Sequence, residues 1–232
     1  MSKRTFIAEQ ERIQGYTHVL LLTTGSVASI KASLIVSELL SYANVKVEVV
    51  STKSSLAFFD VSAVEKAGAR VWRDEDEWAG DGGFRIGDPI LHIELRRWAN
   101  IVLIAPCSAN TLAKIAHGIC DNLATSLLRA LAPTTPTYVF PAMNTLMYEH
   151  PLTNEHLRVV REVVGYNIIG PIGKTLACGD VGACYSSSVA LLQVRDVCIM
   201  SVLAKMYSTG LGAMTEWRDI VQIVVNTFHL VK

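Results

Sequence analysis

The stretch HVLLLTTGSVASIKASLIVSELLSYANVKVEVVST, residues 18–52, decides the fold. Its first eight residues form a short apolar run closed by a glycine, which is typical of a buried strand. Residues 27–42 then carry apolar side chains near helical spacing, Ser26 can cap that helix, and residues 45–52 form a second apolar run. A strand, a helix and a strand in succession predict a βαβ unit.

The alternation continues along the chain. After a loop rich in Asp, Glu and Gly, the pattern predicts helices at 90–98, 110–131 and 156–164 and strands at 100–106, 137–143 and 166–170; the loop spans residues 74–89. Strands that alternate with helices favour a parallel sheet covered on both faces, because parallel connections cross over in a right-handed sense. The sequence therefore predicts an α/β protein.

The composition indicates one globular domain over residues 1–232, with a polar N-terminal arm at residues 1–17. Half of the residues are apolar and 18% are charged, and Lys plus Arg equals Asp plus Glu at 21 each. No net field favours nucleic acid or an anionic membrane surface, so any phosphate must be held locally. The chain shows neither a signal-peptide core nor a membrane span, and we expect a cytoplasmic protein.

The five cysteines do not form a recognisable framework. Their number is odd and no CxxC pair occurs; they are Cys107, Cys120, Cys178, Cys184 and Cys198. This argues against a disulfide scaffold and against a zinc site, and we expect no metal.

Three polar turns follow predicted strands: GSVAS at 25–29, TKSS at 52–55 and SANT at 108–111. The carboxyl ends of parallel strands meet at one edge of a sheet, where ligands bind in folds of this class. One interpretation is that Ser, Asn and Thr merely cap the following helices. The other is a dinucleotide- or flavin-sized pocket with a phosphate at a helix N-terminus. The two interpretations are compatible.

The motifs GSVASIK, TKSSLAFFD, DEDEW, GDPILHIELRRWA, APCSANTLAKIAHGICDNLATSLLRA, PAMNTLMYEHP and LACGDVG stand between residues 18 and 182. In order and spacing they resemble the phosphopantothenoylcysteine decarboxylases and their eukaryotic relatives. The resemblance implies a flavodoxin-like, doubly wound parallel sheet in a three-layer α/β/α arrangement. It also implies non-covalently bound FMN and a homotrimer whose active site lies at a subunit interface.

The resemblance also assigns site residues. His92 matches the family's catalytic histidine, Cys178 the cysteine of its substrate-covering flap, and Asn144 and Met147 fall in its PxMNxxMW signature. The residues that it implies for FMN contact are Gly25, Ser26, Val27, Thr52, Ser54, Phe58, Ser108, Ala109, Asn110, Thr111 and Ala142.

The implied reaction converts 4'-phosphopantothenoylcysteine to 4'-phosphopantetheine by thiol oxidation, loss of CO2 and reduction of an enethiolate. In that scheme His92 is the base or polar partner of the oxidative step, Asn144 holds the carboxylate, and Cys178 protonates the enethiolate. Without the motifs, His92 would be a structural helix residue, Cys178 inert packing and Asn144 a turn residue.

The resemblance is interrupted after Gly182. Residues 183–210 separate LACGDVG from LGAMTEWRDIVQIV at 211–224, so we interpret them as an insertion in the substrate flap, either a translated intron or a lineage-specific loop. Three alternative functions stay open beside the decarboxylase: a peptidyl-cysteine decarboxylase, a regulatory subunit that inhibits a protein phosphatase, and a flavin-binding protein that the insertion leaves inactive.

Overall fold

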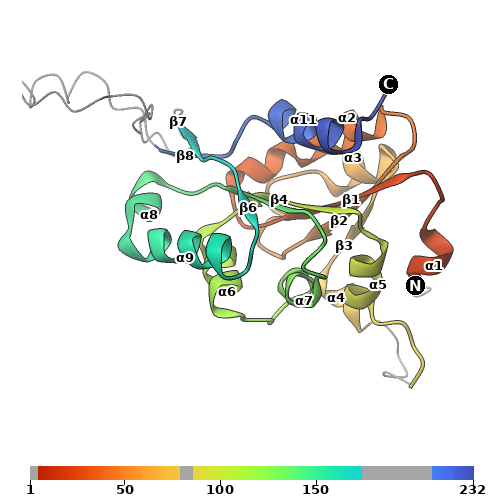
Figure 1. Ribbon diagram of the computed structural model, residues 1–232, viewed down its shortest axis with the longest axis horizontal. Helices are drawn as coiled ribbons and strands as arrows, with labels where there is room; N and C mark the ends of the chain where they lie inside the picture. The colour runs from red at the N-terminus through yellow and green to blue at the C-terminus, as the bar shows by residue number, and fades with distance from the viewer. Residues whose placement is uncertain (1–4, 79–85, 174–210) are drawn as a thin grey trace, which may run out of the picture.

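A six-stranded parallel sheet lies between two layers of helices in the computed structural model, which describes residues 5–78, 86–173 and 211–232 (Figure 1). The strand order is β3-β2-β1-β4-β5-β6. The strands are β1 (Thr17–Thr23), β2 (Val45–Ser51), β3 (Arg70–Trp72), β4 (Ile101–Cys107), β5 (Thr137–Pro141) and β6 (Asn167–Ile168). The predicted doubly wound, three-layer sheet is confirmed.

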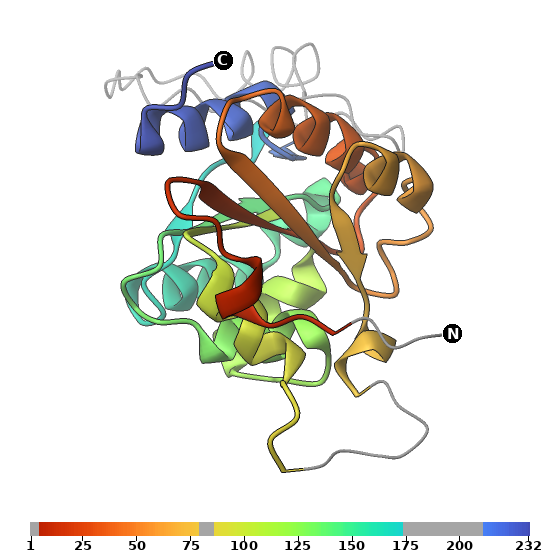
Figure 2. The same ribbon diagram turned by 90° about the vertical axis from the view of Figure 1, so that its right-hand side faces the viewer.

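The two faces of the sheet are read directly from the central strands, whose side chains alternate between faces. Val19 and Leu21 of β1 pack with one helical layer, and Leu20 and Leu22 with the other. The first layer holds α2 (Ala32–Leu40), α3 (Val61–Lys66) and α11 (Trp217–Phe228). The second holds α5 (Leu91–Trp98), α6 (Ala109–His117), α7 (Leu123–Ala130) and α9 (Pro151–Glu162), as Figures 1 and 2 show.

The direction of the strand order reverses between β1 and β4. The chain leaves β1 towards β2 through α2 on one face, and it reaches β4 from β3 through α5 on the other. The turns after β1 and β4 therefore diverge, and they open a crevice at the carboxyl edge of the sheet.

Three predicted helices differ from the structure. The predicted helix 156–164 corresponds to α9, which begins five residues earlier at Pro151 and ends at Glu162. The predicted helix 110–131 is two helices, because Gly118 ends α6 in the left-handed conformation at φ 69° and Asn122 begins α7 by accepting the N–H of Thr125 at 2.9 Å. The predicted helix 27–42 starts as a 3-10 helix, η1 (Val27–Lys31), before α2. Ser26 occupies the capping position of η1 but makes no side-chain capping bond.

Several short elements lie where no element was predicted. They are α3, β3, α4 (Asp74–Glu77), inside the predicted acidic loop, and α8 (Thr145–Glu149). The N-terminal arm is also structured: Phe6 is buried, and α1 (Ala8–Glu11) lies against α5, where the Ala8 N–H donates to Glu94 Oε2 at 2.8 Å.

A second, two-stranded antiparallel sheet joins β7 (Ile172–Gly173) to β8 (Leu211–Ala213). Together with α11 it brings the end of the chain back to the carboxyl edge of β5, where the Met143 N–H donates to the Gly212 carbonyl at 2.9 Å. The predicted insertion at 183–210 and the predicted flap residue Cys178 lie outside the described residues.

Candidate functional site

A cavity of about 750 Å³ lies at the carboxyl edge of the sheet, between the turns that follow β1 and β4. The turns after β1, β2, β4 and β5 all contribute to its wall, in agreement with the strand-end argument. The predicted site residues that line it are Gly25, Ser26, Val27, Ser54, Phe58, Ser108, Ala109, Asn110, Ala142, Asn144 and Met147.

The turn after β1 is held very close to the turn after β2. A Cβ built on Gly25 would lie 2.6 Å from Ser54 Oγ and 2.9 Å from Ser54 Cβ, so only glycine fits between the two turns. The Ser29 hydroxyl donates to the Thr24 carbonyl at 2.8 Å and closes this turn. The start of η1 at Val27 lines the cavity, and a helix start presents backbone N–H groups without helical partners.

Thr24 joins the β1 turn to the β4 turn. Its hydroxyl donates to the Pro106 carbonyl and accepts the N–H of Ser108, both at 2.8 Å. Ser108 in turn caps α6, because its Oγ accepts the N–H of Thr111 at 3.3 Å. Capping and cavity lining therefore coincide in Ser108, as the two sequence interpretations allowed.

Thr52 and Thr111 do not line the cavity. Both are buried behind its wall: the Thr52 hydroxyl bonds to Ser54 Oγ at 3.2 Å, and the Thr111 hydroxyl accepts from Ser108 Oγ at 3.2 Å. They support residues that do face the cavity.

The turn after β5 supplies an amide and a thioether. Asn144 begins α8, and its Oδ1 accepts the N–H of Leu146 at 2.9 Å, which fixes the direction of the side chain at the wall. Met147 follows one helical turn later and is half exposed.

One wall was missed by the sequence reasoning. Residues 212–217 line the cavity from β8 to the first residue of α11, together with Ile30, Lys31 and Met143. A Cβ on Gly212 would lie 2.2 Å from the Met143 carbonyl oxygen, so β8 packs backbone to backbone on the β5 turn. The available signal was LGAM at 211–214, to which no site role was given.

His92 lies elsewhere. The described lining of the cavity contains no residue of α4 or α5. His92 Nδ1 instead bonds to Glu77 Oε1 of α4 at 2.6 Å. Figure 1 shows α4 and α5 on the face of the sheet opposite α2 and α11.

Among the described residues, the buried Cys107 and the acidic groups suggest no second chemistry. Complete burial raises the pKa of the Cys107 thiol well above its usual range, which is typical of inert packing. Within the described ranges, no cluster of three His, Cys, Asp or Glu side chains could hold a metal ion. None of the helices in the described part of the chain has both the length and the apolar character needed to span a bilayer.

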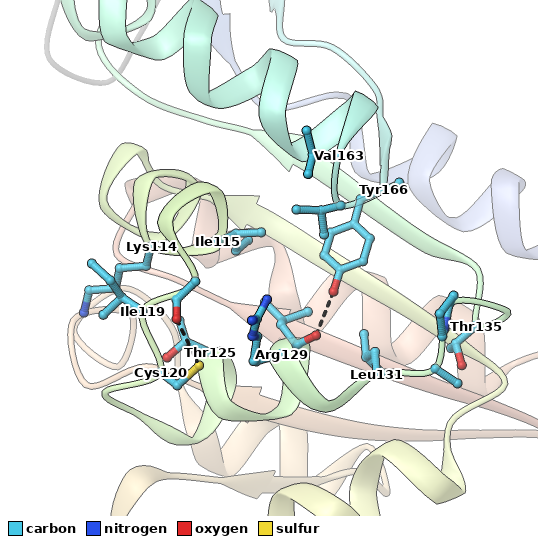
Figure 3. A pocket seen from close by; sticks show the side chains of 16 residues that line it. Lys114, Ile115, Ile119, Cys120, Thr125, Arg129, Leu131, Thr135, Val163 and Tyr166 are labelled. Atoms are coloured by element: carbon cyan, nitrogen blue, oxygen red, sulfur yellow. Dashed lines mark hydrogen bonds between the residues drawn. The ribbon is translucent and has the colours of Figure 1, made fainter.

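A second cavity, of about 280 Å³, lies between α6, α7 and the end of α9 (Figure 3). Tyr166 closes one side, with its hydroxyl donating to the Leu128 carbonyl at 2.8 Å, and burial raises its pKa to about 12. Of the predicted site residues that the structure describes, none lines this cavity.

Comparison with known proteins shows which family the chain resembles. A family model described as "Flavoprotein" matches residues 7–195. A protein of Arabidopsis thaliana named phosphopantothenoylcysteine decarboxylase is 50% identical over 164 residues, which are 71% of this chain and 76% of that protein.

Two further similarities extend over nearly the whole chain. A protein of Schizosaccharomyces pombe named "Probable thymidylate synthase" is 42% identical over 98% of this chain, which spans 32% of that protein's length. A solved structure named "The FMN binding protein AtHal3" is 41% identical with a TM-score of 0.71, and the match covers 92% of this chain and 97% of that one.

Proposed function

The chain belongs to the flavoprotein family, and from this premise we propose that it is an FMN-dependent phosphopantothenoylcysteine decarboxylase. Its substrate would be 4'-phosphopantothenoylcysteine and its product 4'-phosphopantetheine, in coenzyme A biosynthesis. The observation that carries the proposal is the cavity at the reversal point of the sheet, walled by the three predicted turns and by Asn144.

The residues of this cavity suit FMN. The Gly25 turn and the start of η1 offer backbone N–H groups to a phosphate, and Ser26, Ser54 and Ser108 add hydroxyls. The opposite wall is largely apolar, with Ala142, Met143, Met214 and Trp217, and could pack against a flat ring system. A volume of about 750 Å³ lies within the range of cofactor pockets.

The chain's own residues would then position and deprotonate the substrate. Bound FMN would supply the two-electron acceptor for oxidation of the thiol-bearing carbon and the donor that returns the electrons after CO2 is lost. Asn144 would hold the carboxylate with a neutral amide, which does not stabilise the charged ground state against its loss. His92 would take a proton in the oxidative step, and Cys178 would return one in the reductive step.

We propose further that the active site forms between copies of the chain in a homotrimer. The cavity lining at Asn144 and the helix that carries His92 belong to different parts of the described fold. If both act on one substrate molecule, His92 must come from a neighbouring copy, which would place the site at an interface.

The test uses the purified chain and 4'-phosphopantothenoylcysteine. We expect a visible flavin spectrum, a trimer by light scattering, and formation of both CO2 and 4'-phosphopantetheine. A folded but colourless protein would overturn the flavoprotein assignment. A yellow protein that forms neither product would favour the inactive alternative, and action on a cysteine-terminated peptide alone would favour the peptidyl-cysteine decarboxylase.

A substitution of the proposed base separates chemistry from cofactor binding. Because the wall of the cavity contains no part of α5, His92→Asn should retain the flavin spectrum and lose CO2 release by at least about a hundredfold. The matched control is His229→Asn, at the left-handed end of α11, where asparagine fits the backbone. Normal turnover by His92→Asn would show that this residue is not the base.

A further inference from the structure

Glu77 contacts His92 through both of its carboxylate oxygens. Glu77 Oε1 lies 2.6 Å from His92 Nδ1, and Oε2 accepts the backbone N–H of His92 at 3.2 Å. The Glu77 side chain is 7% exposed and the His92 side chain 20% exposed. The carboxylate therefore holds the imidazole at two points, from a position nearly closed to solvent.

Hydrogen bonds hold the helix that carries Glu77 in place. Glu77 is the last residue of α4, and the two preceding aspartates of this helix anchor it. Asp74 Oδ1 accepts the N–H of Leu123 at the start of α7 at 2.9 Å, and Asp76 Oδ2 accepts the N–H of Arg73 at 2.8 Å. Because α4 is held by the bonds of Asp74 and Asp76, the position of the Glu77 carboxylate relative to α5 is set.

The charge of Glu77 has one described partner. In the described part of the chain, the Glu77 carboxylate lies 2.6 Å from His92 Nδ1 and forms no ion pair with a lysine or arginine. A buried carboxylate is costly unless it is hydrogen-bonded or offset by a positive charge. Donation from the Nδ1–H of His92 satisfies the carboxylate.

We propose that Glu77 is the positioning residue of His92, an inference that rests on the decarboxylase function proposed above. By accepting the Nδ1–H, the Glu77 carboxylate selects the tautomer in which Nε2 is the nitrogen that can accept a proton. When the proton of the substrate moves to Nε2, the nearby carboxylate offsets the positive charge of the imidazolium. A carboxylate beside a catalytic histidine performs the same two tasks in unrelated enzymes.

A purely structural role is the alternative. Through Oε2, Glu77 also caps the first turn of α5, where a negative charge is favourable. A capping role predicts a loss of stability alone. A positioning role predicts a loss of turnover with retained FMN content, an unchanged KM and an altered tautomer of His92.

The experiment compares the full-length wild type with Glu77→Gln and measures FMN absorbance, kcat, KM and the ring ¹⁵N chemical shifts of His92. The carboxamide keeps a carbonyl acceptor, removes the charge and can also donate. We expect kcat to fall about tenfold or more, a flavin content and KM within about twofold of wild type, and a loss of the pure Nδ1–H signature. Glu75→Gln, which removes an equal charge from the exposed face of α4, is the matched control.

The outcomes separate the two proposals. A wild type without turnover would overturn the decarboxylase function, while its His92 ring shifts would still decide the tautomer. Turnover of Glu77→Gln within about twofold of wild type, or a wild-type His92 protonated at Nε2 alone, would overturn the role of Glu77. If Glu77→Gln fails to fold, Glu77→Asp keeps the charge but shortens the reach, and it should lower kcat in the same way.

Discussion

β8 can pack closely on the β5 turn because Gly212 has no side chain. Gly212 has φ 144°, and a Cβ there would meet the Met143 carbonyl oxygen at 2.2 Å, a backbone atom that cannot rotate away. We expect Gly212→Ala to lower the free energy of unfolding by more than about 2 kcal/mol and to weaken FMN retention. Thermal melting and flavin absorbance of the purified variant measure both effects.

Gly165→Ala is the control for this substitution. Gly165 also has a positive φ, 84°, but a Cβ there would meet nothing within 4 Å. In this variant, the free energy of unfolding should fall by only about 1 kcal/mol, the cost of a positive φ for alanine, and the flavin should be kept. Equal effects of the two substitutions would show that the contact with Met143 is unimportant.

The residues of the site divide into those that the sequence could predict and those that it could not. Gly25 and Ser108 follow apolar strands directly, so a rule about strand ends brings them together. Met214 and Trp217 reach the same cavity through long-range contacts that local sequence does not encode: the Met143 N–H bonds to the Gly212 carbonyl, and α11 packs on the sheet. Residues 183–210 further separate that segment from the rest of the motif series.

At the scale of elements, His18 joins β1 to the N-terminal arm. It is buried, its Nε2 accepts the N–H of Ile13 at 3.1 Å, and its Nδ1 lies 3.0 Å from Asn100 Oδ1. Burial, together with the charges of Arg12 and Lys46, lowers its pKa from the ordinary value of 6.5, although the bond to Asn100 opposes the shift. The neutral imidazole is thus the form that the fold accepts.

This shift predicts a stability that depends on pH. The unfolded state binds a proton at His18 more readily than the folded state does. The contribution of neutral His18 to the free energy of unfolding is therefore fully present above pH 6.5 and is lost as the pH falls towards the lowered pKa. Relative to His18→Gln, the wild type should lose up to about 1.4 kcal/mol per pH unit in that window. Urea unfolding at about pH 7.5 and 5.5 measures this; parallel losses in both proteins would contradict it.

Elements were predictable where burial is complete and continuous. The uninterrupted apolar runs of β1 and β4 gave an unambiguous pattern. β3 did not, because it has three residues and begins with Arg70, whose charge is balanced by Glu48 at 2.6 Å and Glu11 at 2.9 Å. The apolar spacing of 110–131 likewise continued across Gly118, where only the left-handed backbone reveals the end of α6.

For the whole molecule, the pairing of β7 with β8 brings together two residues that are far apart in the sequence. Gly173 pairs with Leu211, so the residues that flank positions 174 and 210 lie side by side. Removing residues 183–210 would leave nine residues for the same connection, which is sufficient for a loop between paired strands.

We therefore expect the variant lacking residues 183–210 to fold and to retain its flavin. Shortening the connection should raise the free energy of unfolding by about 1.2 kcal/mol, because less loop-closure entropy is lost on folding. Thermal melting, the visible spectrum and CO2 release would be compared with those of the full chain. An unfolded or colourless variant would show that the segment is an integral part of the fold, and not an insertion.

The wall formed by residues 212–217 also sets the order of events when the protein is synthesised. The first turn of the cavity, at Gly25, leaves the ribosome early, but its opposite wall is translated nearly two hundred residues later. A nascent chain that ends before residue 212 lacks this wall of the cavity. We therefore expect stable cofactor binding only after residues 212–217 have been synthesised.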